Sequence, residues 1–164
     1  MHNLKKYFKF DELVKLDPYD RALLIVQVMF NSAQDKEGAP YMNHLLNVSG
    51  KLETEEEKIV GLLHDLVEDT DATFEEVKEA GFSDGVINAL RLVTKQKGED
   101  YPSFIDRIIN SNNKTALKVK LSDMQDNMDP DRMSRLPAEV RERLQKKYEP
   151  QYQRIVTKIG ELKW

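Results

Sequence analysis

Residues 62–70 read LLHDLVEDT, and this apolar stretch contains one imidazole and three carboxylates. The leucines and the valine recur with a helical period of about 3.6 residues, which is typical of a face that packs into a core. The polar side chains of the stretch are His64, Asp65, Glu68 and Asp69. A buried, unpaired carboxylate costs roughly several kcal/mol unless a charge or a metal compensates it. These four side chains therefore either face water or surround a cation.

Helical spacing pairs these side chains. Residues four apart share a helix face, so His64 is expected above Glu68. Asp65 is expected above Asp69 for the same reason. Neighbouring residues are about 100° apart around a helix, so His64 and Asp65 reach one ion only if it lies over the seam between them. His64 and Asp65 therefore offer a nitrogen and an oxygen to a cation, and the carboxylates of Glu68 and Asp69 lie one helical turn further along.

Two other segments offer matching groups. His44 lies on an apolar helix, where a single histidine is more often a core residue than a ligand, and His2 lies near the N-terminus and is given no role. In KLSDMQDN, Lys120, Asp123 and Asn127 are three and four residues apart and share one helix face. Taken alone, this face reads as a solvated polar surface.

Two imidazoles and two carboxylates make a mixed nitrogen and oxygen site for a divalent ion. Such ligands suit manganese or another octahedral metal, and zinc or iron would also fit them. A metal at this site would lower the pKa of a bound water toward neutrality and supply a hydroxide nucleophile. A nearby carboxylate could then handle the proton.

Composition favours one soluble domain. The chain has 164 residues, a net charge of −4, no cysteine, and no segment long and apolar enough for a signal peptide or a membrane span. The acidic balance gives no electrostatic indication of nucleic-acid binding. We therefore expect a cytoplasmic protein in which residues 1–164 form a single domain, and the sequence leaves its oligomeric state open.

The periodicity is helical almost throughout, so the expected fold is an all-α single-domain helical bundle. Asp17-Pro18 and Ser83 read as helix starts, and capping boxes begin at Thr54 and Thr73. The expected helices include 10–16, 21–33, one from about 41, 54–70, 73–81, 83–93, 101–109, 114–128 and 138–162, with a loop at 129–137. Pro150 is expected to kink or interrupt the last helix.

Three motifs occur in an order and spacing that resemble one family. They read G-x-P-Y-x-x-H over residues 38–44, L-L-H-D-x-V-E-D-T over 62–70 and K-L-x-D-x-x-x-N over 120–127. The arrangement resembles the HD-domain metal-dependent phosphohydrolases, and among them the hydrolase domain of RelA/SpoT-type (p)ppGpp enzymes, including small stand-alone alarmone hydrolases. The resemblance covers about residues 20–130, with a C-terminal helical segment at 137–162 beyond it.

The resemblance implies a role for ten residues. The implied metal ligands, usually for Mn²⁺, are His44, His64, Asp65 and Asp123. Glu68 and Asp69 match a carboxylate pair that positions or activates the attacking water and assists the leaving group. The implied substrate-binding residues are Lys36, Tyr41, Lys120 and Asn127. In the family, the reaction removes the 3′-pyrophosphate from guanosine tetra- or pentaphosphate.

Two positions depart from the family pattern. Asp35 stands where arginine is usual, and Phe30 stands where an upstream histidine is usual. A reversed charge beside a polyanionic substrate costs roughly several kcal/mol in a poorly solvated site. These departures favour an alternative within the enzyme class, a phosphatase or nucleotidase that acts on another phosphorylated nucleotide and releases orthophosphate.

Two further hypotheses lie outside the enzyme class. One is a non-catalytic HD-fold regulator that binds a nucleotide, and the other is a purely structural helical scaffold. Retention of every metal-ligand type and of both carboxylates argues against each of them. The basic residues of the last helix, Lys147 among them, read as an ordinary solvated face, and its apolar residues are expected to pack on the domain or on another subunit.

Overall fold

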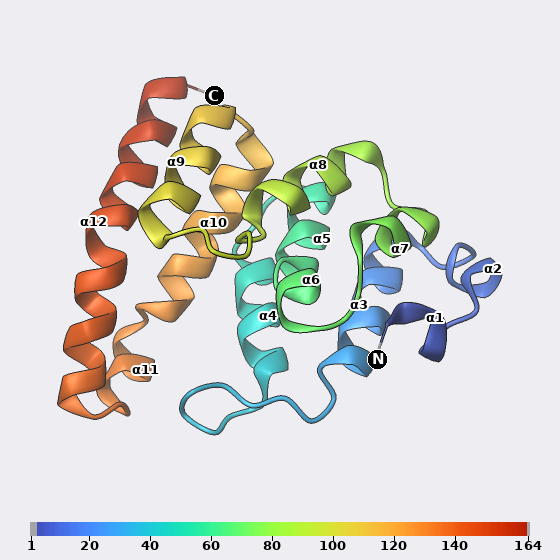
Figure 1. Cartoon of the computed structure of the whole chain (residues 1–164), viewed down its shortest axis with the longest axis horizontal. Helices are drawn as coiled ribbons and strands as arrows, with labels where there is room; N and C mark the ends of the chain where they lie inside the picture. The colour runs from blue at the N-terminus through green and yellow to red at the C-terminus, as the bar shows by residue number, and fades with distance from the viewer. Residues whose placement is uncertain (1–2, 164) are drawn as a thin grey trace.

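The computed structural model describes residues 3–163, so His2 lies outside the described part of the chain. Over this range the fold is all-α, as the sequence predicted, with one isolated β-bridge between Gln34 and Pro40 and no longer strand pairing (Figure 1). The helices described are α1 Leu4–Tyr7, α2 Phe10–Leu13, α3 Pro18–Met29, α4 Tyr41–Gly50, α5 Glu55–Leu63, α6 Leu66–Asp69, α7 Phe74–Glu79, α8 Asp84–Val93, α9 Tyr101–Ser111, α10 Lys114–Asn127, α11 Pro130–Ser134 and α12 Ala138–Leu162.

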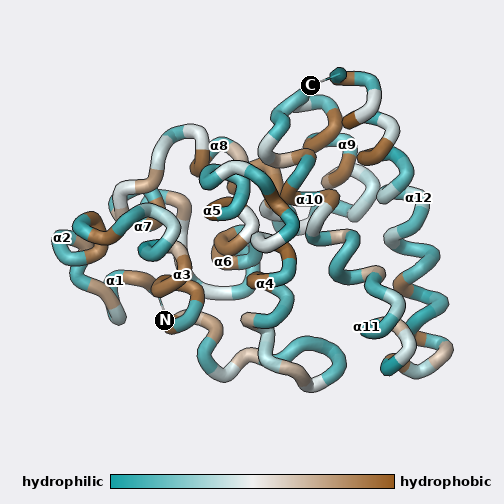
Figure 2. Tube along the Cα trace, turned by 180° about the vertical axis from the view of Figure 1, so that it is seen from behind, coloured by the Kyte–Doolittle hydropathy of each residue, from teal (hydrophilic) through white to brown (hydrophobic). Residues whose placement is uncertain are grey.

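Helix α5 is the centre of the packing, because α3, α4, α8 and α10 all lie against it. It begins at Thr54, whose side chain and that of Glu57 form the predicted capping box. The second half of the helix is apolar and buried on every side, with Ile59, Val60 and Leu62 among its buried residues. Figure 2 shows hydrophobic stretches on α3, α5 and α6 in the middle of the molecule, whereas α11 and the adjoining half of α12 are largely hydrophilic.

Gly61 allows α4 to approach α5 closely. A Cβ atom at this position would lie 2.8 Å from Leu52 Cδ1 and 3.2 Å from the Cα of Ser49. The Leu52 side chain can move away from an added Cβ atom, but the Ser49 backbone belongs to α4, so a larger residue at this position would crowd α4. This close packing brings the C-terminal end of α5 against the α4 face that carries His44.

The helix predicted over 54–70 is wrong in one respect, because it breaks at the His64-Asp65 dipeptide. α5 ends at Leu63, and α6 begins at Leu66 after a turn in which Asp65 has φ −101° and ψ 0°. A hydrogen bond from the Asp69 N–H to the Asp65 carbonyl, 2.9 Å long, closes the first turn of α6. The break lies where the two implied metal ligands leave the helix.

The C-terminal part of the chain also differs from expectation. The loop predicted at 129–137 contains the short helix α11, which Asp129 caps through the backbone N–H of Arg132. α12 continues through Pro150 as a single helix and packs on α9 and α10, with Leu144 and Ile155 buried. Its apolar side is therefore covered within this chain.

Other helix ends follow the sequence signals. The Asp17 carboxylate accepts from the Tyr19 N–H ahead of α3, and Ser83 caps α8. α3 ends at Met29, which is four residues before the expected end at Ala33. No helix within residues 3–163 is both long and apolar enough to cross a membrane.

Candidate functional site

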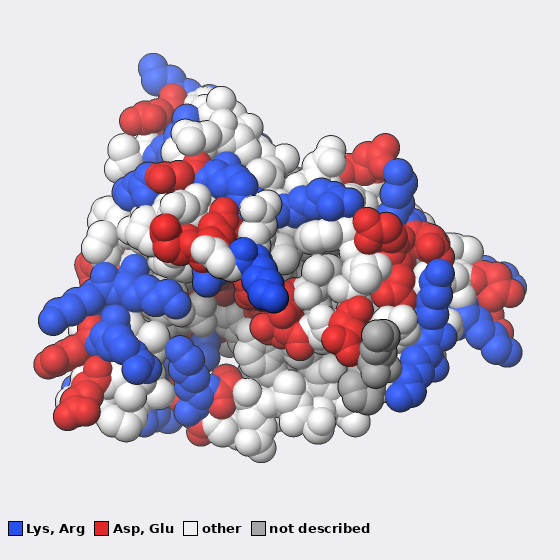
Figure 3. Space-filling model, in the orientation of Figure 1, with Lys and Arg blue, Asp and Glu red and all other residues white. Residues whose placement is uncertain are grey.

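A pocket of about 400 Å³ lies between the α4–α6 side of the molecule and the α10–α12 side. Figure 3 shows basic side chains gathered on the α11–α12 side of this hollow and acidic side chains across from them. Nine of the ten residues assigned from the sequence line the pocket: Lys36, Tyr41, His44, Asp65, Glu68, Asp69, Lys120, Asp123 and Asn127. His64 lies behind this surface, 3% exposed.

The His64 imidazole is fixed at both nitrogens. Nδ1 lies 2.6 Å from the Gly61 carbonyl oxygen, which can only accept, so the Nδ1–H donates to it. Nε2 consequently points toward the pocket, 3.0 Å from Asp65 Oδ2 and 3.3 Å from Asp123 Oδ1. Burial lowers the pKa of His64, but these two carboxylates outweigh it and raise that pKa well above its usual value.

The His44 imidazole approaches the same point from α4. Its Nε2 lies 3.0 Å from Asp123 Oδ1 and 3.7 Å from Asp65 Oδ2, and its Nδ1 lies 2.6 Å from Asp126 Oδ2. The rings of His44 and His64 meet edge to face, with centroids 5.4 Å apart. Burial lowers the pKa of His44, and hydrogen bonds to Asp123 and Asp126 more than offset it, so the pKa is raised.

Two nitrogens and two carboxylate oxygens thus converge, and their spacing fits one divalent cation. Ligand atoms bonded at about 2.1 Å to a shared ion lie about 3.0 to 3.5 Å from one another. Three of the four nitrogen–oxygen separations here, 3.0, 3.0 and 3.3 Å, lie in this range, and the fourth, between His44 and Asp65, is 3.7 Å. His44, His64 and Asp65 also form one group whose ligand atoms all lie within 4.8 Å of each other. The arrangement is a candidate metal site.

Asp123 is held by two neighbours on its own helix. Lys120 Nζ lies 2.8 Å from Oδ2, and Asn127 Nδ2 donates to Oδ1 at 3.1 Å. Burial raises the pKa of the Asp123 carboxyl, but Lys120 and the histidines hold that pKa well below its usual range. Because Lys120 and Asp123 are 8% and 5% exposed, the solvated face suggested by the sequence is wrong for both.

Asp65 has a third partner in Tyr41. The Tyr41 hydroxyl donates to Asp65 Oδ2 at 2.5 Å, and burial together with this carboxylate raises the pKa of Tyr41. The Tyr41 ring stacks on Phe30 with centroids 5.3 Å apart. The aromatic side chain at position 30 therefore supports a residue that touches Asp65.

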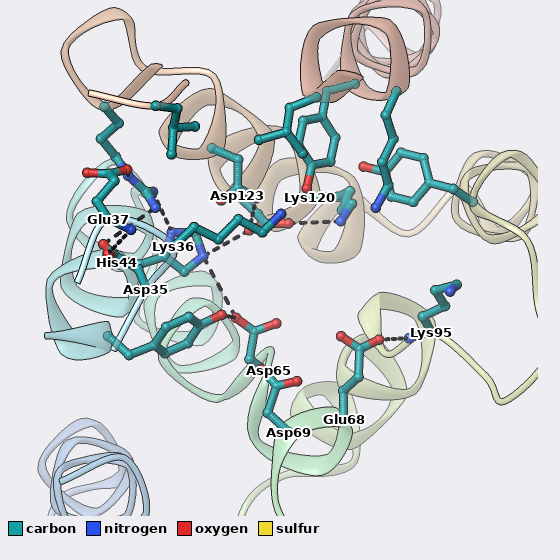
Figure 4. A pocket seen from close by; sticks show the side chains of 18 of the residues that line it. Asp35, Lys36, Glu37, His44, Asp65, Glu68, Asp69, Lys95, Lys120 and Asp123 are labelled. Carbon is teal, nitrogen blue, oxygen red and sulfur yellow. Dashed lines mark hydrogen bonds and ion pairs between the residues drawn. The ribbon is translucent and has the colours of Figure 1, made fainter. Parts of the chain in front are cut away.

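Glu68 and Asp69 lie beside this cluster and are exposed to the pocket. Their carboxylates and that of Asp65 come within 4.8 Å of one another (Figure 4). Partial burial and the charges of Asp65 and Glu68 raise the pKa of Asp69 to about 6, and burial followed by Asp65 raises that of Glu68. The backbone N–H of Lys95 also donates to Glu68, at 3.2 Å.

Four lysines line the pocket. They come from the loop before α4, the loop after α8, α10 and α12, and they are Lys36, Lys95, Lys120 and Lys147. Burial and then the charges of Lys36, Lys95 and Lys120 lower the pKa of Lys147. A site in which neighbouring cations help to lower the pKa of Lys147 favours a multiply charged anion.

Sequence reasoning missed several pocket residues. Lys147 and Tyr148 were expected on a solvated or packing face of α12, yet both line the pocket. Arg132, which also lines the pocket, was not singled out. Nor was Asp126, which bonds His44 from outside the pocket, although it follows Asp123 by three residues and so shares its helix face. Arg132 lay in a segment expected to be a loop and offered no periodic signal.

No protein-family model matches the chain. It is 37% identical over 105 residues to the guanosine-3′,5′-bis(diphosphate) 3′-pyrophosphohydrolase of Aquifex aeolicus, covering 57% of this chain and 15% of that protein. It is 35% identical over 102 residues to the enzyme of that name, MESH1, from Drosophila melanogaster, covering 58% and 56%. For MESH1 of Danio rerio the identity is 41% over 70 residues, covering 39% and 38%.

The matched region therefore spans little more than half of these relatives at most. A solved structure described as a metazoan SpoT orthologue that hydrolyses ppGpp has the same fold. It aligns with a TM-score of 0.63 and 23% identity over 90% of this chain and 97% of that one.

Proposed function

We propose that this chain, a homologue of guanosine-3′,5′-bis(diphosphate) 3′-pyrophosphohydrolases over 57–58% of its length, is a metal-dependent phosphohydrolase of phosphorylated nucleotides. Its most specific form is removal of the 3′-diphosphate from guanosine 3′,5′-bis(diphosphate), the reaction in the relatives' names. We further propose that residues 1–164 act as one HD-type domain, whose motif-bearing core at about 20–130 is completed by the helical segment 137–162.

One observation carries this proposal. Two imidazole nitrogens and two aspartate oxygens converge at 3.0 to 3.7 Å in a pocket that carries carboxylates on one side and lysines on the other. A structural scaffold has no need for such a cluster, because each buried carboxylate requires compensation. A phosphohydrolase needs the metal-binding cluster, the carboxylates that transfer protons and the lysines that bind phosphate.

His44, His64, Asp65 and Asp123 would hold the divalent ion. Mixed imidazole and carboxylate ligands with positions left for water suit Mn²⁺, which we propose as the cofactor. When bound, the ion would supply Lewis-acid polarisation of the phosphate and a water of lowered pKa. Lys120 and Asn127 would hold Asp123 in its ligating orientation, and Tyr41 would do the same for Asp65.

Glu68 and Asp69 would handle the protons. Water adds to the phosphorus bonded to the 3′-oxygen, and the bond between that phosphorus and the 3′-oxygen breaks. One of the two carboxylates would take the proton lost by the water, and the other would return a proton to the departing 3′-oxygen. The products are pyrophosphate and guanosine 5′-diphosphate.

Lys36, Lys95 and Lys147 would bind the diphosphate groups. Their spread around the pocket suits a ligand with negative charge at two ends rather than one. Tyr101 and Tyr148 line the same pocket and offer aromatic surface to a nucleobase.

The test is product identity. Purified protein is stripped with a chelator, loaded with Mn²⁺ and given guanosine 3′,5′-bis(diphosphate) beside guanosine 5′-diphosphate and other phosphorylated nucleotides. Release of pyrophosphate by the loaded protein, and not by the stripped protein or by Asp65→Ala, is the expected result. Release of orthophosphate from another nucleotide would mean that this nucleotide, and not guanosine 3′,5′-bis(diphosphate), is the substrate. No turnover by a protein that holds its metal would indicate a regulator that binds the nucleotide without catalysis.

A further inference from the structure

We infer that Asp126 is a positioning residue for the metal site and that Arg132 holds Asp126 in place. Together they would fix the His44 imidazole with its proton on Nδ1, so that Nε2 is free to bind the ion. This inference rests on the proposed function, because it concerns a ligand of the metal proposed there.

The contact between His44 and Asp126 is short, direct and buried. Nδ1 lies 2.6 Å from Asp126 Oδ2, and each residue is 3% exposed. A carboxylate only accepts hydrogen bonds, so the proton between these atoms comes from Nδ1. Metal-binding histidines are commonly oriented by a carboxylate on the nitrogen that does not bind the metal. His64 uses the Gly61 carbonyl for this purpose, which leaves both Nε2 atoms pointing into the cluster.

Asp126 is in turn fixed by three hydrogen bonds besides the one from His44, and they come from two side chains. Arg132 Nη1 donates to Oδ2 at 2.7 Å and to the Asp126 carbonyl at 3.2 Å, and Asn47 Nδ2 donates to Oδ1 at 3.2 Å. Arg132 Nη1 also comes within 3.4 Å of His44 Nδ1. Both atoms carry protons when they donate to the carboxylate, so this approach adds no bond.

Arg132 also explains the reversed charge at position 35. Its Nε lies 2.9 Å from Glu37 Oε1 and its Nη2 lies 3.6 Å from Asp35 Oδ2. Asp35 accepts backbone N–H groups of Glu37 and Ala39 at 2.9 and 3.0 Å, which shapes the loop that carries Lys36. The Asp35 and Glu37 side chains are each 7% exposed, so a buried cation opposite them is required.

A single guanidinium therefore joins the loop, α10 and the His44 imidazole. Figure 4 shows Asp35, Glu37 and His44 grouped on one side of the pocket, with Lys36 reaching across its open part. The aspartate that would oppose a polyanion instead faces the Arg132 guanidinium, which it shares with Glu37 and Asp126. This cation comes from α11, a segment about 95 residues away from this loop in sequence, as the separation of Glu37 and Arg132 shows.

Arg135 provides a matched control. It also pairs with Glu37, at 3.3 Å, but its side chain is 61% exposed and forms no hydrogen bond or ion pair with Asp126 or His44 among the described residues. Arg135→Gln removes the same charge from the same short helix region and leaves the positioning contacts in place.

The experiment measures Mn²⁺ affinity by calorimetric titration of the chelator-stripped protein, with activity as a second readout. Asp126→Ala is expected to weaken Mn²⁺ binding by about 10- to 100-fold. Asp126→Asn keeps an acceptor oxygen and is less disruptive to folding. Its Mn²⁺ affinity should lie between that of Asp126→Ala and that of the wild type. Arg132→Gln should weaken binding less than Asp126→Ala, and Arg135→Gln should not change it by more than about twofold.

A double variant tests whether Arg132 acts through Asp126. Because Arg132 has no direct contact with the ion in this scheme, Asp126→Ala/Arg132→Gln should bind Mn²⁺ no more weakly than Asp126→Ala alone. Additive losses would overturn this dependence. Wild-type affinity in Asp126→Ala, in a protein that still hydrolyses the nucleotide, would overturn the inference alone. A wild-type protein that takes up no divalent ion would overturn the proposed function and this inference with it.

Discussion

Lys120 and Asp123 form a buried ion pair three residues apart on α10, with 2.8 Å between Nζ and Oδ2. The Lys120 ammonium also lies over the Phe104 ring, 4.9 Å from its centroid. It is therefore a built-in cation that keeps Asp123 ionised whether or not a metal is bound.

Lys120→Met should lower the free energy of unfolding by about 3 to 5 kcal/mol in the presence of a chelator, since it strands a buried carboxylate. Bound Mn²⁺ should reduce this loss, because a second cation then compensates Asp123. Urea unfolding with chelator and with Mn²⁺ measures both quantities. Lys78→Met is the control, because Lys78 and Asp84 are exposed and 4.0 Å apart and should contribute less than about 1 kcal/mol. An equal loss of unfolding free energy with and without Mn²⁺ would contradict the idea that Lys120 and the metal both compensate the Asp123 charge.

Asp69→Asn and Glu68→Gln should separate proton transfer from metal binding. Each substitution removes a carboxylate that lies beside the histidine cluster rather than inside it. We expect kcat to fall by about 10²- to 10⁴-fold with Mn²⁺ affinity changed far less. Steady-state kinetics and metal titration on the same preparation check this. Glu142→Gln, on the exposed side of α12, is the control; loss of metal in either variant would instead make that residue a ligand.

Gly61→Ala should disturb the site by moving a helix. The added methyl group would meet Leu52 Cδ1 at 2.8 Å and the Ser49 Cα at 3.2 Å, so the Leu52 side chain must move and the Ser49 backbone of α4, the helix that carries His44, must give way slightly. Overpacking of this kind costs about 1 to 3 kcal/mol, and the displaced imidazole should also weaken Mn²⁺ binding. Gly160→Ala is the matched helical control, because nothing lies within 4 Å of its added Cβ. It should be neutral or stabilising by up to about 1 kcal/mol, and equal effects at both positions would rule out the packing argument.

Most of the fold followed from local signals in the sequence. Capping residues at Thr54, Thr73 and Ser83 fixed helix starts because each side chain bonds the backbone a few residues ahead. The break at the His64-Asp65 dipeptide did not follow, because periodicity cannot distinguish a continuous helix from two helices joined in register. The two possibilities differ in tertiary structure, where the His64 and Asp65 side chains are both directed at the candidate metal site.

The motif residues of the site could be predicted from the sequence, but the residues that support them could not. His44, His64, Asp65 and Asp123 converge in the structure, although their role as ligands remains a prediction. Their supporting contacts join residues far apart in sequence, such as Glu37 and Arg132, and no spacing rule reaches across that distance. Lys147 was assigned to a solvated face because helix periodicity does not show that residues of other elements form a pocket beside it.

Lys147→Gln should weaken substrate binding more than it slows the chemical step. Lys147 lines the pocket, where its neighbours Lys36, Lys95 and Lys120 lower its pKa, so it faces the space that the diphosphate groups would occupy. The variant should raise KM severalfold, and kcat should change less, since the contact would form in the ground state as well as in the transition state. Lys146→Gln is the matched control, because Lys146 precedes it on α12, is exposed and does not line the pocket. Higher salt should raise the KM of the wild type more than that of Lys147→Gln, and an identical salt response in the two proteins would remove Lys147 from the binding surface.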